Sequence, residues 1–414
     1  MTSKNPPKPN NVVRTTIDLV TSPLQSFLRL EASGGIVLFI SAALAMVFAN
    51  YSPLISVYEQ LINTPIAINF GDFILSKSLL LLVNDGLMAI FFYLVGLEIK
   101  RELLDGDLSS PKKASFSILA ALGGMALPAL LFISLNLGSP SIKGWGIPMA
   151  TDIAFALGAL ALLGSRVPTA LKIFLLALAI VDDLGAISVI ALFYTNEIAA
   201  SYLGFAGISL LTLTMLNYAG FRNMGIGIIL GVITWFFFLK SGIHATLAGV
   251  FLAFLTPASS IPGEGEPKPA KTELLDRYIH ALHPWVAFGI MPVFAFFNAG
   301  VTLVGVDFAE VLQGSVAIGV ILGLVLGKPL GIFLFTYIPA KLKWVELPDG
   351  ITWSQVTAVG FLAGIGFTMS LFIGSLAYTE TLSITESKLG IMVGSLIAAG
   401  LGLTSLWLTV PNKA

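Results

Sequence analysis

Residues 174–194 read FLLALAIVDDLGAISVIALFY, an apolar run that is interrupted only by two adjacent aspartates and a few small residues. The run can cross the hydrocarbon core of a bilayer, which needs about 20 mostly apolar residues. A carboxylate at the centre of such a helix costs about 2.5–3.5 kcal/mol on insertion scales. Successive helical residues point about 100° apart, so Asp182 and Asp183 face different neighbours. This stretch therefore predicts a membrane-spanning helix that handles ions or protons.

The composition of the whole chain fits a membrane protein. Of its 414 residues, 56% are hydrophobic and only 11% are charged, with a mean hydropathy of +0.92. A soluble domain carries about 25% charged residues, so a soluble globule is excluded. The net charge of −1 offers no basic surface to nucleic acid, and the absence of cysteine excludes disulfides and thiolate catalysis. Residues 1–32 contain no signal-peptide core and are expected to form a cytoplasmic N-terminal segment.

Apolar stretches between short polar breaks predict an all-α polytopic membrane protein with one transmembrane domain over residues 33–410. Residues 51–78 include NTPIAINFGDFILSKS, in which apolar residues alternate on either side of a Gly-Asp pair. This pattern predicts a small outer β-hairpin. Residues 257–277 are Pro/Gly-rich and charged, which is typical of a flexible cytoplasmic linker. The twelve predicted transmembrane helices are 33–50, 79–99, 114–136, 144–165, 169–195, 199–217, 223–239, 242–256, 285–304, 314–338, 354–377 and 388–410.

The Lys and Arg residues segregate to one side of this map. If the N-terminus is inside, 17 of the 22 basic residues are cytoplasmic, and Lys328 lies within a span. Such an excess is the positive-inside pattern, and it places both termini in the cytoplasm. The four basic residues on the outer side are Lys77, Lys143, Lys240 and Lys388.

Five ionisable groups lie at membrane depth in this map. Together they oppose insertion by something on the order of 10 kcal/mol unless they are paired or hydrated, so a polar pathway is the favoured interpretation. Buried ion pairs that only set the helix register are the structural alternative, but they do not explain four carboxylates against one ammonium group. One carboxylate that holds either a cation or a proton is sufficient for antiport. The five groups are Asp85, Asp152, Asp182, Asp183 and Lys328.

Two spans contain sequences that break helices. In GIPMATDIAFALG (146–158), Pro148 precedes Thr151 and Asp152, and in AVGFLAGIGFTMSLF (358–372) three glycines precede Thr368. Freed backbone groups are tolerated at membrane depth only where they line a cavity. Hydroxyl, carboxylate and carbonyl oxygens are the ligands of hard cations. One interrupted span in each half of the chain is the pattern of inverted-repeat transporters.

Several motifs resemble those of the NhaA-type bacterial sodium/proton antiporters, over roughly residues 30–410. The resemblance implies twelve helices, with the third to fifth and tenth to twelfth as inverted repeats and the fourth and eleventh crossing as broken helices. It also implies the bacterial inner membrane, a homodimer joined through the outer hairpin, and no cofactor. The motifs are TDIAFALG (151–158), LLGSRVP (162–168), ALAIVDDLGAI (177–187), SGIHATLAG (241–249), HPWVAF (283–288) and GKPLGI (327–332).

The resemblance also implies a role for individual residues. Asp183 would be the main sodium ligand, with Asp182 and Thr151 beside it. Asp182 would also be the proton-linked partner of Lys328, and Asp152 would balance the positive ends of the half-helices. The remaining expected site residues are Asp85, which would line the pathway, and Glu98, Arg101, Glu102, His280 and His283, which would form a cluster for pH control.

The expected function is secondary active, electrogenic and pH-regulated exchange of sodium or lithium for protons. The aspartates would bind cation and protons alternately, and the protein would not be an enzyme. A symporter of similar fold for another solute is the alternative. An intramembrane aspartyl protease is disfavoured because neither Tyr-Asp nor Gly-x-Gly-Asp occurs in the chain.

Overall fold

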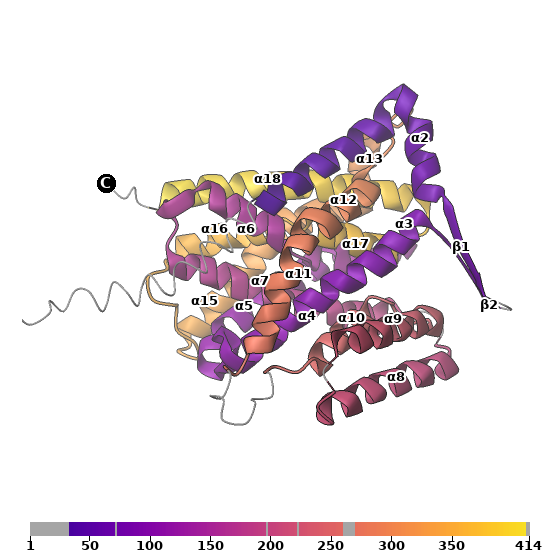
Figure 1. The fold of residues 1–414 in the computed structure, drawn as a ribbon. Coiled ribbons are helices and arrows are strands. Elements are labelled where there is room, and N and C mark those ends of the chain that lie inside the picture. Colours follow the sequence, from indigo (N-terminus) through magenta and orange to yellow (C-terminus); the bar gives the residue numbers. More distant parts are fainter. Residues whose placement is uncertain (1–32, 71–72, 196–197, 222, 260–269, 411–414) are drawn as a thin grey trace, which may run out of the picture.

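A computed structural model of the chain describes residues 33–70, 73–195, 198–221, 223–259 and 270–410. These residues form a bundle of helices with one two-stranded antiparallel sheet that projects from one end (Figure 1). The predicted N-terminal segment 1–32 lies outside the described residues.

The described residues contain nine helices that are long and apolar enough to cross a membrane, and eleven spans if each bent helix pair is counted as one. Eleven of the twelve predicted spans are confirmed in this way. The unbroken spans are Ser33–Asn50, Leu79–Asp105 (α3, η1 and α4), Ala114–Leu135 within α5 (Pro111–Leu135), Thr169–Phe193 (α7), Ala200–Tyr218 (α8), Met224–Ser241 (α9), Glu273–Ala299 (α11, η5 and α12), Ser315–Lys341 (α14, η6 and α15) and Thr381–Thr409 (α18).

Three unbroken spans contain a turn of π-helix, a feature that is frequent at functional sites. The turns are η1 (Val83–Leu87), between α3 (Leu79–Leu82) and α4 (Met88–Asp105); η5 (Val286–Ile290), between α11 (Glu273–Trp285) and α12 (Met291–Ala299); and η6 (Gly323–Gly327), between α14 (Ser315–Leu322) and α15 (Lys328–Lys341). Asp85 lies inside η1, and Lys328 directly follows η6.

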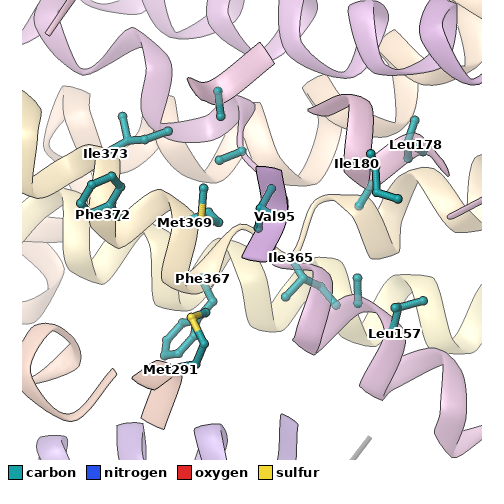
Figure 2. Close-up of a cluster of buried hydrophobic side chains, with 14 of the residues drawn as sticks. Val95, Leu157, Leu178, Ile180, Met291, Ile365, Phe367, Met369, Phe372 and Ile373 are labelled. Carbon is teal, nitrogen blue, oxygen red and sulfur yellow. The ribbon is translucent and has the colours of Figure 1, made fainter. Parts of the chain in front are cut away.

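Two spans are broken, as the sequence predicts. The first consists of a 3₁₀ half-helix, η3 (Pro140–Met149), and α6 (Ile153–Leu162), with a bend of 42°. The second consists of α16 (Trp353–Ala363) and α17 (Phe367–Ala377), with a bend of 48°. Figure 2 shows buried apolar side chains of α4, α6, α7, α12 and α17 gathered around these breaks. The polar groups at the breaks are therefore enclosed in an apolar shell.

The first spans of the two predicted triplets, α5 and the span of α15, run in opposite directions. Gly123 of α5 faces Gly331 of α15, and further along α5 Pro128 faces Gly327. A Cβ added to Gly331 would lie 2.0 Å from the carbonyl oxygen of Gly123, so glycine is required where the two backbones touch. Residue numbers rise along one helix while they fall along the other, and this antiparallel contact agrees with the predicted inverted repeats.

The helix α7 lies at the centre of the bundle, whereas α8 and α9 lie at its edge. In the most apolar window of α7, 61% of the residues are buried, compared with 11% for α8 and 17% for α9. In Figure 1, α8 and α9 form a hairpin at the side of the molecule, next to α10. The span that carries Asp182 and Asp183 is therefore the most enclosed of the nine long helices.

Three predicted segments need correction. The predicted span 242–256 contains only α10 (Leu247–Leu255), whose nine residues rise about 14 Å and cannot cross the bilayer alone. Residues 51–78 begin with a helix, and their strands are shorter than the predicted segment. Residues 71–72 lie outside the described residues. The ninth span begins at Glu273, inside the predicted linker, because acidic residues in its first turn favour a helix start there. The remaining elements are α2 (Ser52–Asn63), β1 (Pro65–Phe70), β2 (Phe73–Ser78), η2 (Asp107–Ser109), η4 (Gly164–Arg166) and α13 (Phe308–Gln313).

Candidate functional site

The two breaks lie against each other and satisfy each other's backbone groups. The Asp152 N–H donates to the carbonyl oxygen of Ile365 at 2.7 Å, and the Thr151 hydroxyl donates to that of Ala363 at 2.9 Å. In return, the Ser370 hydroxyl donates to the carbonyl of Ile147 at 2.7 Å. These side chains are buried, so the crossing provides the partners that water cannot provide at membrane depth.

The carboxylate of Asp152 lies between two helix N-termini. One oxygen accepts from the N–H of Phe155 at 3.0 Å in the first turn of α6. The other accepts from the N–H of Thr368 at 3.0 Å in the first turn of α17, and also from the Thr368 hydroxyl. Each N-terminus carries a partial positive charge and unpaired N–H groups. One carboxylate therefore caps both half-helices.

Lys328 and Asp182 form a buried ion pair. The ammonium donates to the Asp182 carboxylate at 2.6 Å, and the two side chains are 1% and 2% exposed. The ammonium also donates to the Thr151 hydroxyl, which in turn donates to the Ala363 carbonyl at the end of α16. Lys328 thus binds an aspartate directly and contacts the carbonyl end of a half-helix through Thr151.

Asp183 has a different environment from its neighbour. It is 1% exposed, and neither of its carboxylate oxygens hydrogen-bonds to any described residue. It lines a cavity of about 50 Å³ together with Glu98, Asp152, His283 and Thr368, and Asp182 does not line this cavity. That volume holds only a few water-sized groups. A buried anion without a partner is strongly disfavoured, so this carboxylate needs a proton or a cation.

The local sequence explains why the two aspartates diverge. The apolar helix α7 continues through both of them, and its 100° step turns consecutive side chains to different sides. Leu178 and Ile180, shown in Figure 2, are buried with them in the same shell. The helix therefore turns Asp182 toward α15 and Asp183 toward the cavity between α4, α11 and the breaks.

Asp85 lies apart from this centre. Its carboxylate pairs with Lys77 at 2.5 Å, and the side chains are 15% and 29% exposed. The backbone carbonyl of Asp85 also accepts a hydrogen bond from the indole N–H of Trp235 at 2.8 Å. Asp85 does not line the cavity of Asp183.

The structure places the residues expected to control pH in two positions. Glu98 and His283 line the cavity. Arg101 and Glu102 lie near the end of α4, where the Arg101 guanidinium is 2.9 Å from the Glu102 carboxylate. Arg101 also approaches Asp276 of α11 at 3.8 Å. His280 is exposed on the next turn of α11.

Three residues of this region were missed as site members by the sequence analysis. Thr368 was quoted only as part of a breaking motif, although its hydroxyl follows the glycines at the start of a half-helix. Ser370, two residues later, contacts the other break. Asp276 precedes His280 by one helical turn, a spacing that could have pointed to it.

The oxygen atoms at the crossing could bind a cation in transit. Among the residues that the structure describes, no group of three or more His, Asp or Glu side chains is arranged to hold a metal ion. The donor set of carboxylate, hydroxyl and carbonyl oxygens suits a hard monovalent cation that enters and leaves. Such an ion is cargo for this site.

Comparisons with known proteins agree with this chemistry. A family model described as Na+/H+ antiporter 1 matches residues 25–406. The chain is 52% identical over 382 residues to Na(+)/H(+) antiporter NhaA 1 of Klebsiella pneumoniae subsp. pneumoniae, covering 92% of this chain and 94% of that protein. It is 50% identical over 390 residues to NhaA 2 of Shewanella denitrificans, covering 93% and 95%. It is 51% identical over 390 residues to NhaA of Escherichia coli O1:K1, covering 94% and 98%.

Proposed function

This chain belongs to the NhaA-type Na+/H+ antiporter family, and on that premise we propose that sodium and protons compete for the carboxylate of Asp183. The protein is a multi-pass membrane transporter that exchanges sodium for protons, and it is not an enzyme. Family membership thus favours exchange over the symport alternative. The observation that supports the role of Asp183 is its burial in a small cavity without a hydrogen-bond partner among the described residues.

Sodium would be bound by oxygen atoms of Asp183, Asp182 and Thr151. The Thr151 oxygen accepts from Lys328 and its hydroxyl donates to a carbonyl, so its free electron pairs are limited. Sodium and the Lys328 ammonium therefore compete for Thr151 and Asp182. We infer that sodium binding displaces the ammonium, and that proton binding at the aspartates releases sodium.

Competition can be tested in everted membrane vesicles that are acidified inside by respiration. Sodium is added at several pH values, and the rise of internal pH is recorded. If one proton competes with sodium, the apparent KM for sodium should fall about tenfold for each unit by which the pH rises. If two protons compete, it should fall about a hundredfold for each unit. At pH values above the pH of activation, the maximal rate should stay constant. A KM that does not depend on pH would contradict the proposal.

We further propose that the exchange is electrogenic, because Asp182 and Asp183 can together carry more than one proton for each sodium. A membrane potential is worth about 2.3 kcal/mol per charge per 100 mV, which is sufficient to drive sodium outward. Clamping the potential to zero should slow exchange in energised vesicles. Unchanged rates would argue for a one-to-one exchange. Lithium, another hard monovalent cation, should replace sodium in the same assay.

The cluster at the ends of α4 and α11 is proposed to set the pH of activation. Arg101 lies between the carboxylates of Glu102 and Asp276. Arg101→Gln should therefore shift the pH profile while leaving the sodium KM at the optimum unchanged. Arg277→Gln is the matched control, since its pair with Glu273 is 3.6 Å long and largely exposed. Equal profiles for Arg101→Gln and the wild type would remove this region from pH control.

We propose that the protein lies in the bacterial inner membrane with both termini cytoplasmic, and that it forms a homodimer through the outer hairpin. The sheet contains only β1 and β2 among the described residues, so each strand leaves one edge for another strand. Such edges readily pair with a second chain. Membrane lipid would cover the apolar faces of α8 and α9. Removal of the hairpin should yield monomers, as judged by cross-linking in membranes.

A further inference from the structure

The 3₁₀ half-helix η3 is weak by itself and yet leads directly into the ion site. Its ten residues exceed the usual length of 3₁₀ helices, whose hydrogen bonds have poor geometry. Pro148 has no N–H and cannot donate within the turn. Thr151 and Asp152 follow this segment within three residues of its end. A displacement of η3 would therefore displace both side chains.

Three hydroxyl groups from residues outside η3 donate hydrogen bonds to its carbonyl oxygens. The Tyr378 hydroxyl donates to the Ser141 carbonyl at 2.5 Å, and the Ser370 hydroxyl donates to that of Ile147. The Tyr194 hydroxyl donates to the Lys143 carbonyl at 2.7 Å and accepts from the N–H of Gly146 at 3.4 Å. These bonds are distributed over both ends of η3.

Glycines allow the two tyrosines to reach the backbone. A Cβ at Gly144 would lie 2.1 Å from the Tyr378 hydroxyl oxygen, and a Cβ at Gly146 would lie 2.9 Å from that of Tyr194. Trp145, between these glycines, packs edge-on against Phe193 with ring centroids 5.1 Å apart. The contact is therefore specific in shape as well as in hydrogen bonding.

The elements that provide these hydroxyls also carry the ion site. Tyr194 directly follows α7, which carries Asp182 and Asp183, and Tyr378 directly follows α17. Ser370 lies two residues after Thr368, whose hydroxyl and N–H bind Asp152. Each bond thus joins η3 either to the chain next to α7, which carries Asp182 and Asp183, or to the chain in or next to α17, whose Thr368 binds Asp152.

We propose that Tyr378, Tyr194 and Ser370 are positioning residues that brace η3 against α7 and α17, so that this half-helix does not open from them as a separate gate. The proposal rests on the proposed function, because it takes the crossing as the ion site. The brace keeps Thr151 and Asp152 in place while sodium and protons exchange. Its loss should weaken sodium binding more than it slows turnover.

Tyrosine-to-phenylalanine changes test the brace, because they remove one oxygen atom and keep the ring. Tyr378→Phe and Tyr194→Phe should each raise the sodium KM about two- to tenfold, the equivalent of one hydrogen bond of about 0.5–1.5 kcal/mol. The maximal rate should change less, and the double variant should show a larger KM. Tyr202→Phe, on the peripheral helix α8, is the control and should leave the KM unchanged. An unchanged KM in the double variant would overturn the proposal.

Cross-linking distinguishes a brace from a gate, and the natural chain has no cysteine to interfere. Gly144→Cys combined with Tyr378→Cys leaves a gap that a short bifunctional thiol reagent can fill. If η3 is braced, the bridged protein exchanges ions and recovers the sodium KM that Tyr378→Cys alone loses. If η3 must separate from α17, the bridge stops exchange and the proposal fails. The single-cysteine variants, treated with the same reagent, are the controls.

Failure of the brace and failure of the proposed function give different results. If Asp183 is not the ion site, Asp183→Asn will still exchange sodium for protons, whatever the tyrosine variants do. If only the brace is wrong, Asp183→Asn is inactive while Tyr378→Phe and Tyr194→Phe keep the wild-type KM. A bridge that does not form in the folded protein would contradict the contact between η3 and Tyr378.

Discussion

Two lysine–aspartate pairs among the described residues include an aspartate that lies in a span, and the two ion-pair distances are nearly equal. The Lys328 ammonium lies 2.6 Å from the Asp182 carboxylate, and the two side chains are 1% and 2% exposed. The Lys77 ammonium lies 2.5 Å from the Asp85 carboxylate, and these side chains are 29% and 15% exposed. Next to the first pair in sequence lies Asp183, whose carboxylate has no hydrogen-bond partner in the described part of the chain. Distance alone would rank the pairs as equals. Burial separates them, because an enclosed charge that loses its partner cannot be solvated.

The largest difference is expected in the exchange activity of two variants, Asp183→Asn and Asp85→Asn. Asp183→Asn keeps the shape of the side chain but removes the charge for which sodium and protons compete, so it should abolish sodium-driven proton movement. Asp85→Asn should change the rate by no more than about fivefold, the equivalent of an interaction of about 1 kcal/mol. Both are measured as pH changes in vesicles, with the amount of folded protein checked in detergent. Near-normal exchange by Asp183→Asn would refute the assignment.

The next difference concerns stability. Lys328→Ala leaves Asp182 buried without its cation and should lower the free energy of unfolding by about 3–5 kcal/mol. Lys77→Ala should cost only about 0–1 kcal/mol, because water can reach Asp85. Thermal unfolding in detergent measures both changes. Equal melting temperatures for the two variants would show that burial does not decide the strength of these pairs.

A double variant sharpens the interpretation of the buried pair. In Lys328→Ala with Asp182→Ala neither charge is stranded, so part of the stability lost in Lys328→Ala should return. The same melting experiment gives the coupling between the two residues. If the double variant is as unstable as the sum of the single changes, Lys328 acts mainly through Thr151 on the carbonyl end of α16.

The smallest difference is expected in how the stability effects of Lys77→Ala and Lys328→Ala respond to salt. At 1 M salt the screening length is about 3 Å, so the effect of Lys77→Ala on stability should vanish. The effect of Lys328→Ala should remain, because ions do not enter the buried site. Melting curves at low and high salt test this contrast. A salt-sensitive Lys328→Ala effect would place that pair in contact with solvent.

The sequence by itself determined the spans, the two breaks and the buried charges. These features depend on local properties: a run of about 20 apolar residues, a proline or three glycines within it, and a carboxylate where none is expected. Local patterns were less decisive at 242–256, an apolar stretch that is short for a span and in which the chain forms only the nine-residue α10. Apolarity measures the avoidance of water, and a short helix packed against α4 avoids water too.

The partners of the polar groups were decided by the tertiary structure. A buried ammonium can be neutralised by an aspartate or by the carbonyl end of a helix. Packing gives Lys328 both, through Asp182 and Thr151. The same holds for the bonds from Thr368 to Asp152 and from Tyr378 to Ser141, which join residues more than 200 positions apart. Helical periodicity states only that Asp182 and Asp183 diverge. Which of them meets a cation and which faces a cavity depends on neighbouring helices, and their positions arise only when the whole bundle has packed.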